Sequence, residues 1–239
     1  MSEPKVFKAS AESKAKAKQF RLFALLAWFI AIAGEVFAIL KLIKDETMVW
    51  LIVAIVVILI LSIVGSVLWK KANRLDPASE KNKFKFFVQN QLGAILAVLA
   101  FLPLVIFIFA SKNTSKSTKG ITGAIAVVAL LAATIVGIDF NPPSIEKYSK
   151  EIQAQTDSLK QINHGVDHVY WTRGGSKYHI FKDCQHIKNR DILEGTVKDA
   201  WESNPNIKDN DLSELCKTCK NRAERENAKE AEQVIEAVK

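Results

Sequence analysis

The chain has 239 residues, of which 49% are apolar, and its net charge is +8. The charge is uneven: residues 1–139 hold 17 basic and 8 acidic residues, whereas residues 140–239 hold 16 and 17. The apolar residues gather before residue 140 in runs too long for a soluble core, which excludes a fully soluble fold. The second part lacks the excess of basic residues that DNA and RNA binding requires, which argues against a nucleic-acid partner.

Residues 1–19 are polar and rich in lysine, and we predict a solvated cytoplasmic tail beside the membrane. Four apolar runs follow, each close to the roughly 20 residues that cross a bilayer as a helix. They cover residues 20–43, 48–69, 92–110 and 121–138. No cleavage site of small residues follows the first run, so we interpret it as a retained anchor.

The lysines and arginines of the short connections predict the orientation. Twelve lie in or beside the tail and the second loop, when Arg21 is counted with the tail. Five lie in or beside the first and third loops, when Lys41 is counted with the first. The positive-inside rule therefore places both termini in the cytoplasm, and we expect a multi-pass protein of the plasma membrane. A reducing cytoplasm keeps the three cysteines free for metal binding.

Three features of the spans invite interpretation. Glu35 lies in the middle of the first span, where a carboxyl group either has a function or is hydrogen-bonded between helices. Pro103 predicts a kink in the third span, with the freed carbonyl bonded by a neighbouring group. Gly120, Gly123 and Gly137 predict ordinary packing between helices, because none belongs to a Gly-x3-Gly pattern.

Residues 140–165 predict a helical stalk. Asn141-Pro-Pro143 ends the fourth span, Ser144 caps a new helix, and apolar residues recur at heptad spacing from Ile145 to Ile162. This stripe either docks on the module that follows or pairs with a second copy of the chain to give a homo-oligomer. Gly165 occupies the expected C′ position of the helix.

Residues 166–219 predict a small α+β module. Two runs rich in β-branched and aromatic residues, 169–172 and 177–181, flank two glycines and predict a β-hairpin. Thr196 and Asp199 fit a capping box for a helix over residues 197–203. Residues 220–239 then predict a charged, solvated C-terminal helix.

The module holds every cysteine of the chain. His179 and Cys184 form one pair, and Cys216 and Cys219 form a Cys-x2-Cys knuckle. Two pairs of soft ligands match the four-coordinate sites that zinc prefers, so we predict zinc as the cofactor. His168 or His186 is the alternative fourth ligand. Four protein ligands leave no open position, which predicts a structural site.

These residues also resemble a known family. The string Tyr-Trp-Thr-x-Gly-Gly-Ser-Lys-Tyr-His, followed by Cys184 and Cys216-x2-Cys219, is similar to the small metal-binding domain first known from the bacterial Ada DNA-repair protein. The resemblance covers about 50 residues and implies a zinc ion at His179, Cys184, Cys216 and Cys219. His179 stands where the repair protein has a cysteine.

We therefore expect a mostly α fold: a four-helix transmembrane bundle, a stalk and a small α+β zinc-binding domain with a β-hairpin. The predicted function is that of a binding or sensing adaptor, with membrane lipids and a cytoplasmic protein as partners. No catalytic residue is assigned, because the chain has no Ser/His/Asp set, paired carboxylates or phosphate loop. The alternatives are a nucleic-acid-associated membrane protein and a small transporter or membrane enzyme that depends on Glu35.

Overall fold

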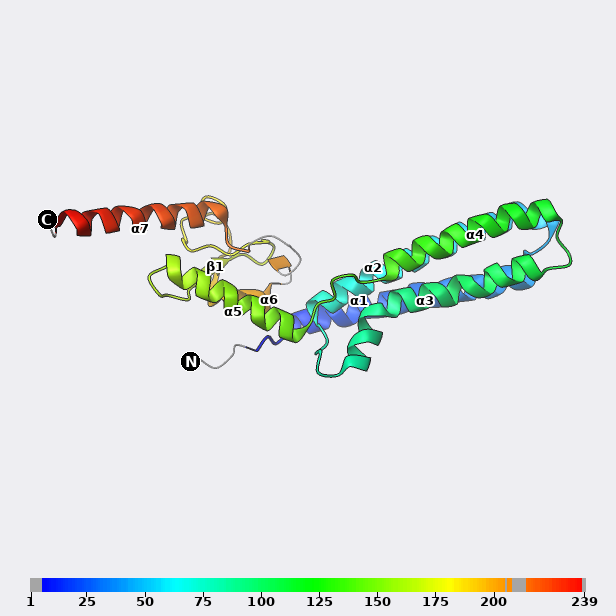
Figure 1. Ribbon diagram of the computed structural model, residues 1–239, viewed down its shortest axis with the longest axis horizontal. Helices are drawn as coiled ribbons and strands as arrows, with labels where there is room; N and C mark the ends of the chain where they lie inside the picture. The colour runs from blue at the N-terminus through cyan, green and yellow to red at the C-terminus, as the bar shows by residue number, and fades with distance from the viewer. Residues whose placement is uncertain (1–5, 205, 208–213, 238–239) are drawn as a thin grey trace. The chain divides into compact units, whose positions relative to one another are not determined.

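The computed structural model describes residues 6–204, 206–207 and 214–237. By internal contacts the chain divides into two compact units (Figure 1). The membrane unit comprises residues 16–73 and 81–142, and the second unit, the module unit, comprises residues 1–15, 74–80 and 143–239. The first five residues of the predicted tail and the last two of the predicted C-terminal helix lie outside the described residues.

Four long apolar helices lie wholly or for most of their length in the membrane unit, and each is long and apolar enough to cross a membrane. They are α1 (Ala11–Lys41), α2 (Met48–Leu75), α3 (Lys83–Ala110) and α4 (Lys116–Gly137). The predicted spans are thus confirmed as helices. Helix α3 begins well before the predicted residue 92, because Asn82 caps it by accepting from the Lys85 N–H at 3.0 Å.

The core of the membrane unit is built mainly from alanine and isoleucine residues of all four helices, including Ala38, Ile55, Ala97 and Ala129. Large apolar side chains such as Phe29 (72% exposed) and Val49 (71%) face outward instead. An apolar exterior around a close-packed interior is the arrangement expected of helices surrounded by lipid.

Helices α3 and α4 approach each other most closely at two glycines. A Cβ atom added to Gly137 would lie 2.5 Å from the backbone N of Ala94 and 2.6 Å from the backbone C of Gly93. Only glycine fits such an approach. The expectation of ordinary packing at Gly137 is therefore wrong, because the partner glycine comes from another helix and no sequence motif reveals it.

Glu35 is buried among the helices and has a defined partner. Its Oε1 accepts a hydrogen bond from the N–H of Leu104 at 3.2 Å, directly after Pro103. Helix α3 is continuous across this proline. Pro103 removes one backbone hydrogen bond from this turn of α3, because proline has no N–H. The Glu35 carboxyl group accepts a hydrogen bond from the next N–H, that of Leu104, in the same turn.

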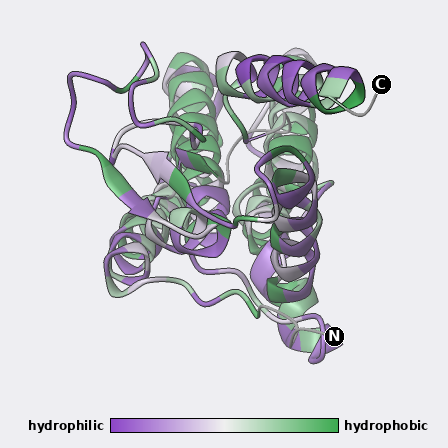
Figure 2. Cartoon of the chain, turned by 90° about the vertical axis from the view of Figure 1, so that its left-hand side faces the viewer, coloured by the Kyte–Doolittle hydropathy of each residue, from purple (hydrophilic) through white to green (hydrophobic). Residues whose placement is uncertain are grey.

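The module unit contains α5 (Ile145–Ile162), β1 (Val169–Trp171), β2 (Leu193–Gly195), α6 (Val197–Ser203) and α7 (Lys217–Ala237). The expected fold class, mostly helical with a small β element, is confirmed. Thr196 and Asp199 form the predicted capping box of α6. Helix α7 is mainly hydrophilic (Figure 2), as its alternating charges predict.

The sheet differs from the predicted hairpin. Strand β1 pairs antiparallel with β2, and Tyr170 lies opposite Glu194. The second predicted run contributes two isolated bridges. Tyr170 and His179 exchange two backbone hydrogen bonds of 2.7 Å, and Tyr178 bridges Leu215. The turn between them is as expected, since the Gly175 N–H donates to the Thr172 carbonyl. Strand β2 was missed because its three residues show no alternation.

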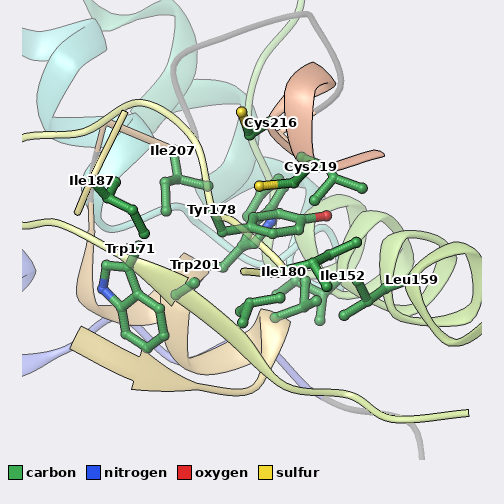
Figure 3. Packing of buried hydrophobic residues seen from close by; sticks show 14 of the residues in the cluster. Ile152, Leu159, Trp171, Tyr178, Ile180, Ile187, Trp201, Ile207, Cys216 and Cys219 are labelled. Atoms are coloured by element: carbon green, nitrogen blue, oxygen red, sulfur yellow. The ribbon is translucent and has the colours of Figure 1, made fainter. Parts of the chain in front are cut away.

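The apolar stripe of α5 is buried within the module unit. Tyr148, Ile152 and Leu159 join the core that Trp171, Tyr178 and Trp201 form (Figure 3). Docking on the module, one of the two alternatives for the stripe, is therefore the arrangement that the chain adopts. The burial of these large side chains supplies the main apolar stabilisation of the unit.

The N-terminal tail also contributes to this core. Phe7 is 1% exposed and packs edge-on against Tyr148, with ring centroids 5.2 Å apart. Its N–H donates to Ser149 Oγ at 3.0 Å, and the Lys8 N–H donates to Glu202 Oε1 at 2.8 Å. The prediction of a solvated tail is therefore wrong for this stretch. A single Phe among lysines and small residues gives no periodic signal that would reveal it.

Gln155 is the polar residue in the α5 stripe, and it ties α5 to the module. Its Oε1 accepts from Tyr178 Oη and from Trp201 Nε1, both at 3.0 Å. We predict that Gln155→Leu lowers the free energy of unfolding of the module unit by about 2 kcal/mol, because it leaves two buried donors unsatisfied. Hydrogen exchange of α5 amides in the full chain measures this loss. Gln161→Leu, at an exposed position of α5, is the control and should leave the exchange unchanged.

The end of α5 places a histidine in a conformation that favours glycine. His164 has a φ of 50°, and Gly165 follows with its N–H bonded to the Lys160 carbonyl at 2.8 Å. This is a Schellman ending in which His164, rather than the predicted Gly165, takes the C′ position.

We predict that His164→Gly stabilises the module unit by about 1 kcal/mol, because glycine adopts positive φ without steric cost. Slower hydrogen exchange at the end of α5 would show the gain. His164→Val should have the opposite effect, since a β-branched residue is least tolerated at positive φ. Faster exchange in His164→Gly would contradict the assignment.

Candidate metal centre

The structure brings four potential ligands together from three separate segments. His179 follows Tyr178 at the bridge to β1, Cys184 lies in the loop after Phe181, and Cys216 and Cys219 stand at the start of α7. Their ligand atoms all lie within 4.8 Å of one another, and all four side chains are buried. Figure 3 shows Cys216 and Cys219 beside Tyr178 at the edge of the core.

Backbone pairing holds the two ligand pairs in register. The Tyr178 N–H donates to the Glu214 carbonyl and the Cys216 N–H donates to the Tyr178 carbonyl, each at 2.9 Å. These bonds join the residue before His179 to the residues that enter the knuckle. The fixed spacing of Cys-x2-Cys in the first turn of α7 then sets the position of Cys219.

The loop that carries Cys184 is fixed by its own contacts. The Cys184 carbonyl accepts from the N–H groups of Ile187 and Lys188, both at 2.9 Å. Arg222 of α7 donates to both carboxylate oxygens of Asp183, at 3.0 and 2.9 Å, and its guanidinium stacks 4.0 Å from the ring centroid of Phe181. This clamp places Cys184 against the helix that carries the other two cysteines.

The donor set suits a soft metal cation. In a tetrahedral site with metal–sulfur bonds of about 2.3 Å, neighbouring ligand atoms are about 3.8 Å apart. The Sγ of Cys219 and the Nδ1 of His179 are already 3.6 Å apart. Small rotations of the remaining side chains would close the set around one ion, so the cluster can hold a metal.

Burial sets the protonation of these groups in the ion-free unit. It lowers the pKa of His179 to about 4, with smaller contributions from His186 and Lys177, so the imidazole is neutral at pH 7. Burial also raises the pKa of the Cys219 thiol to about 12. A cation would therefore have to displace the thiol protons, and metal binding would release them.

The other histidines considered as fourth ligand lie elsewhere. His186 Nε2 is 3.3 Å from Thr218 Oγ1, and its ring centroid is 6.4 Å from that of His179. His168 packs against Tyr170 and lies 3.8 Å from Glu194. Within the described residues, the ligand cluster that contains the three cysteines includes His179 alone among the histidines.

A cavity of about 340 Å³ opens beside the cluster, and sequence analysis did not predict it. Its wall includes two of the potential ligands, His179 and Cys216, and three cationic side chains, Lys177, Arg190 and Lys217. Among the described residues, no carboxylate lines it. The three cations come from three separate segments, so only the folded chain brings them together.

Comparison with protein-family models, with curated proteins and with solved structures finds no match to the chain.

Proposed function

We propose that the chain is an integral membrane protein whose cytoplasmic module unit is an Ada-like zinc-binding module that acts as a binding or sensing adaptor. The observation that carries the proposal is the buried cluster of three cysteines and one histidine, with its ligand atoms within 4.8 Å of one another. Three thiolates and an imidazole form a common set for structural zinc, and such a set occupies all four positions of a tetrahedral ion. The zinc would stabilise the fold and leave no position for a substrate.

The cytoplasmic location of the module is supported by the distribution of lysine and arginine among the loops. Free thiols agree with it, since a reducing compartment preserves them as metal ligands. The same placement exposes the module to soluble proteins of the cytoplasm.

The cavity beside the cluster is the proposed binding surface. Lys177, Arg190 and Lys217 give it a positive potential in a part of the chain whose net charge is about −1. Such a surface favours an anionic group, and we propose an acidic or phosphorylated segment of a cytoplasmic protein as the partner. Extended DNA is a poorer match, because the cations are confined to one cavity.

The adaptor role is tested by capture of partners from solubilised membranes with the tagged full chain. The double variant Lys177→Glu/Arg190→Glu is expected to lose a partner that the wild type retains, while its metal content stays unchanged. The charge-matched control is Lys182→Glu/Lys188→Glu, whose two exposed side chains lie outside the cavity wall. Equal capture by both variants would reject the cavity as the binding surface.

A further inference from the structure

A second cavity, of about 510 Å³, lies in the membrane unit between the ends of α1 and α3. One part of its wall is apolar and includes Ile43 and Phe107. The other part includes Lys41, Lys44 and Lys112. The cavity therefore joins an apolar surface to a concentrated positive charge.

Within the part of the chain that the structure describes, no acidic side chain neutralises the positive charge of this cavity. Among those residues no carboxylate lines the cavity, and none pairs with Lys41, Lys44 or Lys112. Asp45 follows Lys44 but is turned to another partner: both of its carboxylate oxygens accept from the Ser115 N–H, at 2.9 and 3.1 Å. The three lysines are thus available to an external anion.

The position of the cavity along the helices indicates which anion would meet it. Helix α1 ends at Lys41 and α3 ends at Ala110, so the cavity lies where two apolar spans reach the polar surface. Leu40 (69% exposed) and Phe107 (52%) continue its apolar wall along the outside of the helices. In a bilayer this level is that of the phosphate groups of the lipid, and the acyl chains begin just below it.

We propose that this cavity binds the headgroup of an anionic phospholipid. The three lysines contact its phosphate, and an acyl chain lies along Leu40 and Phe107. A lipid with net negative charge is preferred to a zwitterionic one, because a choline group would bring a cation to the same lysines. The inference concerns the membrane unit alone and does not depend on the metal centre.

Titration of the delipidated full chain with phosphatidylglycerol or phosphatidylcholine, followed by native mass spectrometry, tests the proposal. The wild type is expected to retain phosphatidylglycerol in preference to phosphatidylcholine. Lys44→Gln/Lys112→Gln is expected to bind phosphatidylglycerol roughly 30-fold more weakly. Each lysine near the lipid surface strengthens binding by about fivefold, and the two factors multiply. The fold of each variant is checked by circular dichroism and by monodisperse elution.

The matched control is Lys116→Gln/Lys119→Gln, which removes the same charge at the same end of the membrane unit without touching the cavity wall. It should retain the wild-type affinity. Equal loss in both double variants would show diffuse attraction to charge and overturn the proposal. Equal retention of the two lipids by the wild type would also overturn the proposal. So would displacement of bound phosphatidylglycerol by millimolar inorganic phosphate as effectively as by added phosphatidylglycerol.

Discussion

Cys216→Ser is expected to abolish metal binding and to unfold the module unit in the otherwise intact chain. Cys216 is one of four buried potential ligands, and a serine hydroxyl is a far weaker ligand for a soft cation than a thiolate. Structural zinc contributes about 10–16 kcal/mol of apparent binding free energy in small domains, which equals or exceeds the total stability of about 5–15 kcal/mol of a typical domain.

The measurement combines metal analysis with hydrogen exchange of the full chain in detergent. Amides of α5 and α6 should lose their protection in Cys216→Ser, whereas those of the membrane unit should keep theirs. Removal of the metal from the wild type with a strong chelator should give the same pattern. His186→Gln is the control, because His186 lies beside the site but outside the ligand cluster. A Cys216→Ser protein with metal and full protection would show that the cysteine is no ligand.

The second large effect is expected at the close approach of α3 and α4. Gly137→Leu should lower the free energy of unfolding of the membrane unit by about 3 kcal/mol or more, the upper end of the usual cost of overpacking. The added side chain would begin within 2.7 Å of backbone atoms of Gly93 and Ala94, and backbone atoms inside a helix cannot move aside as a flexible side chain does.

Gly120→Leu is the matched control in the same helix, because no atom lies within 4 Å of an added Cβ there. It should be neutral or slightly stabilising, since leucine favours the helix over glycine by up to about 1 kcal/mol. Titration with sodium dodecyl sulfate in mixed micelles, monitored by the fluorescence of Trp28 and Trp69, measures both variants. Equal effects of the two substitutions would contradict the close contact at Gly137.

The sequence predicted an element correctly wherever the residues of that one segment are enough to define it. The four spans follow from their length and apolarity, α5 follows from its heptad stripe, and α6 follows from the capping box of Thr196 and Asp199. The two ligand pairs are likewise local, because His-x4-Cys and Cys-x2-Cys each lie within one turn or loop. These features needed no knowledge of what packs against them.

The features that sequence analysis missed all join segments far apart in the chain. Phe7 enters a core formed mainly by residues after 144, and Gln155 accepts from Tyr178 and Trp201. The contact of Gly93 with Gly137 depends on which faces of two helices meet. Strand β2 has three residues and no pattern, so pairing with β1 alone defines it. The cationic cavities have the same origin, since their lysines and arginine come from separate elements.

The most direct test of the central claim is X-ray absorption spectroscopy at the zinc edge on the purified full chain, normalised to protein concentration. We predict about one zinc per chain, bound by three sulfurs at about 2.3 Å and one nitrogen at about 2.0–2.1 Å. A chain that is folded and free of metal would contradict the account. A zinc ion with an oxygen ligand in place of one of the four protein ligands would also contradict it, because such a site would be open rather than structural.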